Sequence, residues 1–135
     1  MATDNPGILL VNLGSPDSPE VPDVRRYLDE FLSDPRVIDI PWAIRQAVLK
    51  LAILPFRPKE SAEAYEKIWG PEGSPLIVTT NRVADELRGR FDRPIEVGMR
   101  YGNPSIASAV DRLLDQGVDD IFLIPLYPHY AMSSY

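Results

Sequence analysis

Three short apolar runs constrain the fold of this chain more than any other feature of its sequence. The runs occupy residues 7–14, 95–101 and 120–125, and the first ends at a glycine. The first is a continuous apolar run, which is typical of a strand that is buried on both faces, and the other two are predicted to be the second and third strands. Five segments with helical spacing of apolar residues lie between them, at 24–32, 42–54, 59–69, 75–90 and 106–114. This alternation predicts right-handed βαβ units and an α/β fold built on a parallel sheet of three strands.

Local signals predict where some of these helices begin, end and face. Asn103-Pro104 is predicted to begin the last helix, because asparagine is a good N-cap and proline suits the first turn. Gly117 is predicted to end the same helix. In the helix at 59–69, the spacing predicts that Ile68 faces inward.

The composition is that of one globular domain. The chain has 135 residues, of which 44% are hydrophobic and 25% charged. A net charge of −6 argues against general nucleic-acid binding, which needs a basic surface. The chain has no cysteine, which excludes disulfides, cysteine-ligated zinc and an iron–sulfur cluster held by this segment. Neither a secretory signal nor an apolar stretch long enough to span a bilayer is present, so we expect a cytoplasmic protein.

The stretch Trp42–Leu54 is unusually apolar for a surface helix. Its clearly polar residues are Arg45, Gln46 and Lys50. Such a helix packs against the body of its domain, forms a lip over an apolar ligand pocket, or lies on a membrane surface. Packing is the commonest of these, while the two basic residues suit contact with anionic lipid.

The carboxyl ends of the predicted strands are the expected place for a ligand, because parallel sheets bind ligands at that edge. Arg100, Tyr101 and Tyr127 lie there, and Arg57 and Tyr65 are predicted to approach from the helices inserted before the second strand. Aromatic rings with guanidinium groups suit a planar, hydrophobic molecule that carries carboxylates. Alternatively, Tyr101 and Tyr127 are core aromatics with hydrated hydroxyls, and both interpretations stay open.

Two other candidate sites are less specific. The loop Gly14-Ser15-Pro16 follows a strand, but neither of the glycine-rich phosphate-binding motifs is present. His129 is the only histidine, and a protein metal site normally needs three or four ligands. We therefore interpret His129 as a loop residue and only a weak candidate for a metal ligand.

Six sequence blocks occur in a characteristic order. They are GILLVNLGSP at 7–16, FLSDPRVI at 31–38, SAEAYEKIW at 61–69, EGSPL at 72–76, MRYG at 99–102 and PLYPHY at 125–130. In these blocks the chain resembles the N-terminal half of a bacterial ferrochelatase, the enzyme that inserts Fe²⁺ into protoporphyrin IX in haem biosynthesis. The resemblance covers nearly all of residues 7–135.

The resemblance implies two Rossmann-like, chelatase-type lobes with a porphyrin cleft between them. Residues 1–135 would form the N-terminal lobe, with helices on both faces of its sheet and an inserted helical lip at about 36–58, and the second lobe would be absent from the chain. By family pattern, the porphyrin contacts are Leu13, Arg57, Tyr65, Ser74, Arg100, Tyr101, Tyr127 and Ser133. Leu13 replaces a tyrosine or methionine that some members direct towards the metal path, so a metal-ligand role is not expected there.

The same resemblance places the family's metal-handling histidine and its partner glutamate in the second lobe. We therefore expect no catalytic residue, no metal ligand and no tightly bound cofactor in this chain, with Fe²⁺ and porphyrin as substrates of the intact enzyme. The expected partners are the porphyrin, the C-terminal lobe and a membrane surface reached through the lip. The isolated chain is predicted to be inactive.

Two alternatives remain at this point. The first is a self-sufficient single-lobe chelatase that works as a homodimer on a cobalt- or other metal-porphyrinoid. The second is a non-catalytic module that binds porphyrin or docks on a membrane, for which charged residues at Leu49 and Ile53 would abolish liposome association.

Overall fold

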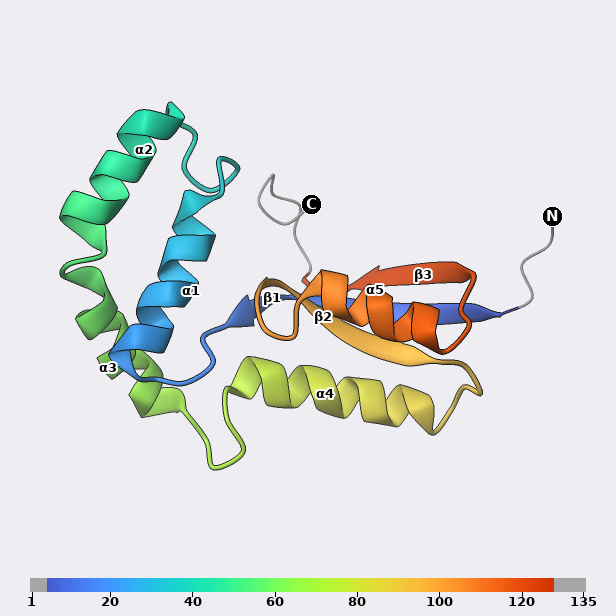
Figure 1. The fold of residues 1–135 in the computed structure, drawn as a ribbon. Coiled ribbons are helices and arrows are strands. Elements are labelled where there is room, and N and C mark those ends of the chain that lie inside the picture. The colour runs from blue at the N-terminus through green and yellow to red at the C-terminus, as the bar shows by residue number, and fades with distance from the viewer. Residues whose placement is uncertain (1–4, 128–135) are drawn as a thin grey trace. The chain divides into compact units, whose positions relative to one another are not determined.

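A computed structural model describes residues 5–127 of the chain. Its elements are β1 (Pro6–Ser15), α1 (Val21–Ser33), α2 (Trp42–Val48), the π-helix η1 (Leu49–Ile53), α3 (Arg57–Ile68), α4 (Pro75–Arg88), β2 (Ile95–Gly102), α5 (Ile106–Asp115) and β3 (Asp120–Pro125) (Figure 1). They form two compact units. Among the described residues, the sheet unit comprises 5–14 and 76–127, and the helical unit comprises 15–75.

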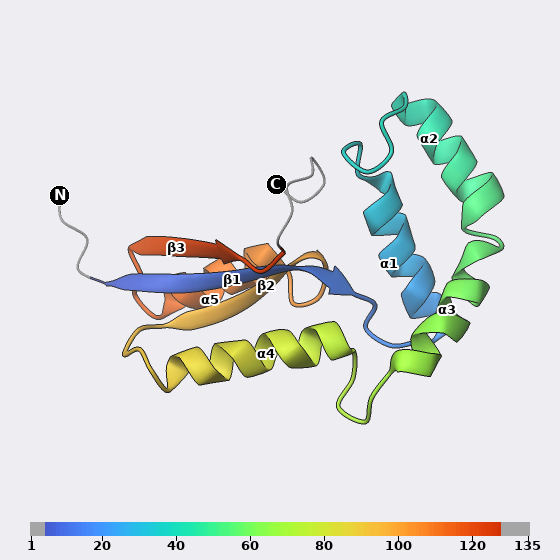
Figure 2. The same ribbon diagram turned by 180° about the vertical axis from the view of Figure 1, so that it is seen from behind.

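The sheet unit contains the predicted parallel sheet. Its strand order is β2-β1-β3, and β1 pairs with β3 in parallel from Pro6 opposite Asp120 to Val11 opposite Pro125. The three strands run in the same direction in both views of the ribbon (Figures 1 and 2). The predicted three-stranded α/β fold is therefore confirmed.

The central strand β1 supplies a core to each face of this sheet, because successive side chains of a strand point to opposite sides. Leu9 and Val11 pack in one buried cluster with Ala109 and Leu113 of α5. On the other face, a second cluster joins Leu10 to Ala84 of α4 and to three residues of β2, namely Ile95, Val97 and Met99. Both faces of β1 are thus covered, which is why its sequence reads as a continuous apolar run.

Helix α5 approaches the sheet closely at a glycine of β2. A Cβ at Gly98 would lie 2.9 Å from the Cα of Ile106 and 3.3 Å from the Cβ of Ala109. The absence of a side chain at this position lets α5 lie against the strand. α5 begins at Ile106, with Ser105 as its N-cap: the Ser105 hydroxyl accepts a hydrogen bond of 3.1 Å from the backbone N–H of Ser108.

The predicted helix start at Asn103-Pro104 is therefore wrong. These two residues are joined by a cis peptide bond in the loop between β2 and α5. The serine that follows supplies the capping oxygen instead. The predicted end of the helix holds, since Gly117 has a φ of 80° immediately after it.

Arginine side chains cover the outer edge of β2, which forms an edge of the described sheet. Arg88 of α4 donates a 2.7 Å hydrogen bond to the carbonyl of Ile95, and Arg112 of α5 donates one of 3.1 Å to the carbonyl of Val97. Carbonyls of an edge strand otherwise offer acceptors to strands of other molecules. The two arginines therefore protect this edge.

The helical unit contains α1, α3 and the predicted lip between them. Its fully or nearly fully buried apolar residues include Val24 of α1, Leu49 of η1, and Pro58 and Ala62 of α3. The single helix expected at 42–54 is an α-helix continued by a π-helix, in which the N–H of Leu54 bonds the carbonyl five residues back at 2.8 Å. The inward orientation predicted for Ile68 is wrong, because this side chain is 59% exposed.

Candidate functional site

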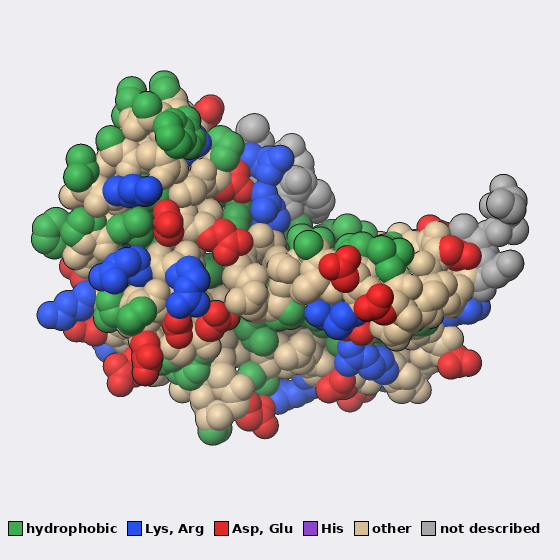
Figure 3. Space-filling view, viewed as in Figure 1, with side chains coloured by type: hydrophobic (Ala, Val, Ile, Leu, Met, Phe, Trp, Pro, Cys, Tyr) green, Lys and Arg blue, Asp and Glu red, His purple; other side chains and the backbone are tan. Residues whose placement is uncertain are grey.

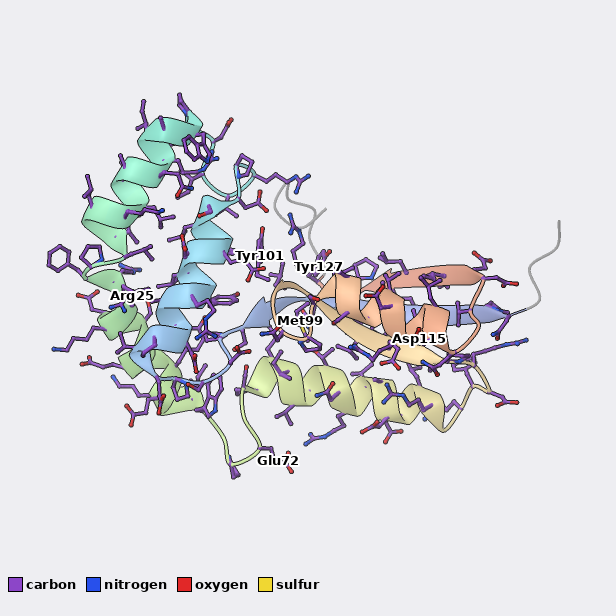
Figure 4. The ribbon with its side chains drawn as sticks, in the orientation of Figure 1. Arg25, Glu72, Met99, Tyr101, Asp115 and Tyr127 are labelled. Carbon is purple, nitrogen blue, oxygen red and sulfur yellow. The ribbon has the colours of Figure 1, made fainter. Side chains whose placement is uncertain are left out.

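Four of the predicted site residues lie at the carboxyl edge of the sheet unit. Leu13 is near the end of β1, Arg100 and Tyr101 are near the end of β2, and Tyr127 follows β3. Parallel strands end at the same side of a sheet, and Figure 4 labels Tyr101 and Tyr127 close to that end. Arg100, Tyr101 and Tyr127 thus lie at the edge at which the sequence placed them, and Leu13, included only by family resemblance, lies there too.

The two tyrosines at this edge have different surroundings. Tyr101 is 1% exposed, and the guanidinium carbon of Arg100 lies 4.8 Å from its ring centroid. A guanidinium over an aromatic ring is an attractive cation–π contact. Tyr127 is half-buried and packs against the cluster that contains Leu9 and Val11. Both rings thus contribute to packing, and the half-buried Arg100 and Tyr127 are the more accessible of the group.

Gly14 brings the ends of β1 and β2 close together. Its φ is 119°, a conformation that side chains other than glycine rarely adopt. A Cβ at this position would overlap the carbonyl group of Tyr101. The glycine that ends the first apolar run is therefore required by its contact with the neighbouring strand.

Asn12 is a positioning residue that sequence reasoning missed. Its side-chain oxygen accepts a 2.8 Å hydrogen bond from the N–H of Leu13, and its amide nitrogen donates one of 3.1 Å to the hydroxyl of Thr80. Thr80 in turn donates to the carbonyl of Leu76 at 2.7 Å. This chain of bonds ties the end of β1 to α4 and fixes the backbone beside Leu13. The signal was a single polar residue inside an otherwise apolar strand.

The helical unit contains an apolar cavity of about 540 Å³ between α1, the end of the lip and α3. It is lined by Leu28, Phe31, Leu32, Ala52, Ile53, Phe56, Arg57, Glu60 and Ser61. Arg57 is exposed at the first position of α3, and within residues 5–127 it makes no ion pair. The cavity therefore combines aliphatic and aromatic walls with a cation available to a ligand.

Tyr65 and Ser74 are the other site residues predicted in the helical unit. Tyr65 is half-buried in α3, its ring meets that of Trp69 edge-to-face at 6.3 Å, and burial raises the pKa of its phenol. Ser74 is buried immediately before α4. Ser133 and His129 lie outside the described residues.

The predicted set thus falls into a group of four residues in the sheet unit and a group of three in the helical unit. Its assembly around a single ligand stays a prediction. Among residues 5–127, no three His, Cys, Asp or Glu side chains gather as a metal site would require.

Comparison with known proteins shows which protein family this chain is similar to. A family model described as Ferrochelatase matches residues 5–135. Proteins named Ferrochelatase from Azotobacter vinelandii and Opitutus terrae are 55% and 53% identical over 128 and 134 residues, which are 94% and 97% of this chain. One from Coxiella burnetii is 50% identical over 132 residues, or 95% of this chain. The chain spans only 38%, 39% and 37% of the lengths of these relatives, respectively.

Proposed function

Because the chain belongs to the ferrochelatase family, we propose that it forms one wall of a porphyrin site at which ferrous iron is inserted in haem biosynthesis. The reaction exchanges two pyrrole protons for Fe²⁺. Two N–H bonds break, the four pyrrole nitrogens bind the metal, and the iron keeps its oxidation state. The porphyrin, the iron and the reaction are proposed for the whole enzyme. The relatives of this chain are more than twice as long as the chain itself.

The apolar cavity beside Arg57 is the observation that carries this proposal. A porphyrin is a flat apolar macrocycle with carboxylate side chains, so it needs both hydrophobic walls and cationic contacts. Leu28 and Phe31 offer such walls, while Arg57 offers a guanidinium that can hold a carboxylate in a bidentate pair. At the sheet edge, Arg100 and Tyr127 repeat the combination of a cation and an aromatic ring.

The residues of this chain bind and orient the substrate in the proposed mechanism. Only contacts that are stronger in the transition state than in the ground state accelerate a reaction. Walls that hold the macrocycle best in the geometry required for metal entry therefore lower the barrier to insertion. The two pyrrole protons need a base. We propose that the C-terminal region of the longer family members supplies it, as the family resemblance implies.

The experiment has a binding arm and an activity arm. Titration of the 135-residue chain into a dicarboxylate porphyrin should quench porphyrin fluorescence and saturate. Arg57→Ala should weaken binding about tenfold, which corresponds to a loss of about 1.4 kcal/mol of binding free energy. Arg90→Ala, which removes an exposed arginine after α4, should leave binding unchanged. A flat titration with the wild-type chain would refute the proposed wall.

The activity arm compares the chain with the intact relative from Azotobacter vinelandii. We expect the chain alone to insert no iron, while the intact relative serves as the positive control. Turnover by the chain at a similar rate would show that it carries its own base. It would favour a self-sufficient homodimer instead.

We also propose that the protein acts in the cytoplasm, with its lip in contact with a membrane surface. No helix among residues 5–127 has the length and apolarity needed to cross a membrane. The proposed contact is therefore peripheral, and it is supported by the apolar side chains that the lip exposes.

A further inference from the structure

Arg45 of α2 is a buried cation inside the helical unit. Its side chain belongs to a residue that is only 6% exposed, whereas Lys50 and Arg57 further along the lip are exposed. Figure 3 shows the outer surface over α2, where hydrophobic side chains gather. An arginine does not lose its proton in a protein. The lip therefore places a permanent positive charge out of contact with water.

The guanidinium of Arg45 uses one of its three nitrogens among residues 5–127. Nη1 donates a 2.9 Å hydrogen bond to the carbonyl of Ile40. Nε is shielded from solvent and has no acceptor. Nη2 likewise donates to none of the described residues, although it is not shielded to the same degree. Because buried donors normally have acceptors, the unfilled edge formed by Nε and Nη2 requires an explanation.

No carboxylate of the described residues forms an ion pair with Arg45. The two acidic residues nearest to it along the chain are Asp34, which accepts a 2.8 Å hydrogen bond from the N–H of Arg36, and Asp39, which is exposed. Residues 40–59 contain four basic residues and no acidic one. A buried charge without a counter-ion is unfavourable, so an anion from outside this segment would stabilise it.

The edge formed by Nε and Nη2 has the geometry that a carboxylate requires. The N–H bonds on this edge of a guanidinium are parallel, and they hold two oxygens of one carboxylate or phosphate side by side. The bond from Nη1 to Ile40 restricts the plane of the group. Helix α2 is in turn tied to the end of α1, because Gln46 donates a 3.4 Å hydrogen bond to the hydroxyl of Ser33. The two donors are therefore oriented before a ligand arrives.

We propose that Arg45 binds an oxoanion, with a carboxylate as the best-fitting class, through Nε and Nη2. Since Nε is shielded, the anion enters at Nη2 and the guanidinium turns slightly to offer both nitrogens. The occupied site neutralises the buried charge, and Arg45 then joins the anion to the loop that contains Ile40. Binding to the folded state therefore stabilises the helical unit.

Two sources can supply this carboxylate: a small carboxylate free in solution, or a carboxylate of a porphyrin. The anion site itself does not depend on the proposed function, and only the second source rests on it. A small dicarboxylate such as succinate is therefore the first probe, because it tests the site without any porphyrin.

The experiment is thermal unfolding of the 135-residue chain, followed by circular dichroism, with chloride replaced by succinate at constant ionic strength. The wild-type midpoint should rise with succinate and then saturate. Arg45→Met keeps most of the side-chain volume without the charge, so it should be at least as stable as the wild type in chloride and should not respond to succinate. Arg90→Met, the same change at an exposed arginine, should respond as the wild type does.

Arg45→Lys separates the charge from the paired donors. It keeps the positive charge but loses the fork, so about tenfold more succinate should be needed for the same rise in midpoint. A wild-type midpoint that does not depend on succinate would overturn the proposal. An equal rise in the wild type and Arg45→Met would do the same, because salts excluded from the surface stabilise proteins without a site. A deficit of Arg45→Met that is identical with and without succinate would assign Arg45 a purely structural role.

A second measurement needs no variant that has to fold. In the ¹H–¹⁵N NMR spectrum of the wild-type chain, the Nε–H signal of Arg45 should shift with succinate and saturate. A shift with a dicarboxylate porphyrin but not with its dimethyl ester would assign the porphyrin as a source, whereas a shift with succinate alone would assign a free carboxylate. A signal that moves with neither would overturn the anion site even if the porphyrin quenching experiment succeeds. Conversely, a succinate shift stands if that experiment fails.

Discussion

Replacement of Gly14 by alanine tests the account of the carboxyl edge of the sheet. Gly14 has a φ of 119°, which strains any residue that carries a Cβ. The new methyl group would also overlap the carbonyl oxygen of Tyr101 and lie 2.9 Å from its carbonyl carbon. Because both atoms belong to the backbone of β2, no side-chain rotation relieves the contact. One strand end must move.

The expected loss of stability has two parts. A non-glycine residue in this region of φ costs on the order of 1–3 kcal/mol. Forcing extra atoms into a packed site costs typically about 1–3 kcal/mol more. Gly73 separates the two parts, because its φ is 118° and no atom lies within 4 Å of the position of its Cβ. Gly73→Ala should therefore show the conformational cost alone.

The assay is urea unfolding followed by far-ultraviolet circular dichroism, with porphyrin titration as a second measurement. Gly14→Ala should be less stable than Gly73→Ala by about 1–3 kcal/mol. Gly117→Ala adds a control inside the sheet unit, where φ is 80° and the nearest atom is 3.4 Å from the Cβ position. Equal stability of all three variants would refute the close contact between β1 and β2. Weaker porphyrin binding by Gly14→Ala alone would support the role of this edge.

Three further predictions concern single interactions. Burial raises the pKa of the Tyr65 phenol above its usual 10.0. The neutral phenol therefore stabilises the fold fully below pH 10.0, and this stabilisation is lost as the pH rises through the raised pKa. Tyr65→Phe should remove this alkaline loss of stability in unfolding measurements. The hydroxyl of Ser18 donates a 2.6 Å hydrogen bond that lowers the pKa of Asp23 below 3.8. Asp23→Asn should therefore destabilise the chain at neutral pH, and its deficit should vanish as acid titrates the wild-type carboxyl below the lowered pKa. Arg112→Ala removes the ion pair of Glu96, which keeps a hydrogen bond from Gln116, and uncovers the Val97 carbonyl at the β2 edge. Unfolding should therefore show a loss of about 1–3 kcal/mol and light scattering should show self-association. A monomer of unchanged stability would contradict the protective role.

The strands could be predicted closely because each is a short segment rich in apolar residues, although β3 exposes Phe122 and Leu123. The run at 120–125 is β3, and that at 95–101 is β2 without its last residue. Helix existence was equally predictable from spacing, but boundaries depend on single hydrogen bonds. At the start of α5 the sequence predicted Asn103 as the cap, and only the observed backbone shows that the Ser105 hydroxyl faces the Ser108 N–H.

The orientation of the lip was beyond sequence reasoning. Periodicity finds the apolar face of a helix but does not say whether that face lies against the protein or away from it. Here Leu49 packs inside while Leu51 and Trp42 are exposed. The π-helix adds a shift of register that has no sequence signature of its own. Leu49, one of the two positions that the sequence suggested for testing membrane contact, is therefore on the buried side of the lip.

The candidate site was predictable in part, and the parts have different origins. Strand ends and a parallel sheet suffice to place Arg100, Tyr101 and Tyr127 at one edge. The inclusion of Leu13 and Ser74 came only from resemblance to a family. Asn12 escaped both routes, since its role depends on a hydrogen bond to Thr80 in a helix 68 residues away.

The two exposed apolar surfaces of the chain differ in the charge around them, and so do the partners proposed for them. Besides the lip, β3 exposes Phe122 and Leu123, on opposite faces of a strand because they are adjacent. This strand is preceded by Asp119 and begins with Asp120, whereas the lip has no acidic residue between 40 and 59. In the proposed membrane contact, an anionic bilayer would attract the basic residues of the lip and repel the acidic start of β3, so we expect no competition between the two surfaces for it. Covering both faces of β3 requires protein on each side of the sheet, which the C-terminal region of a longer ferrochelatase would supply.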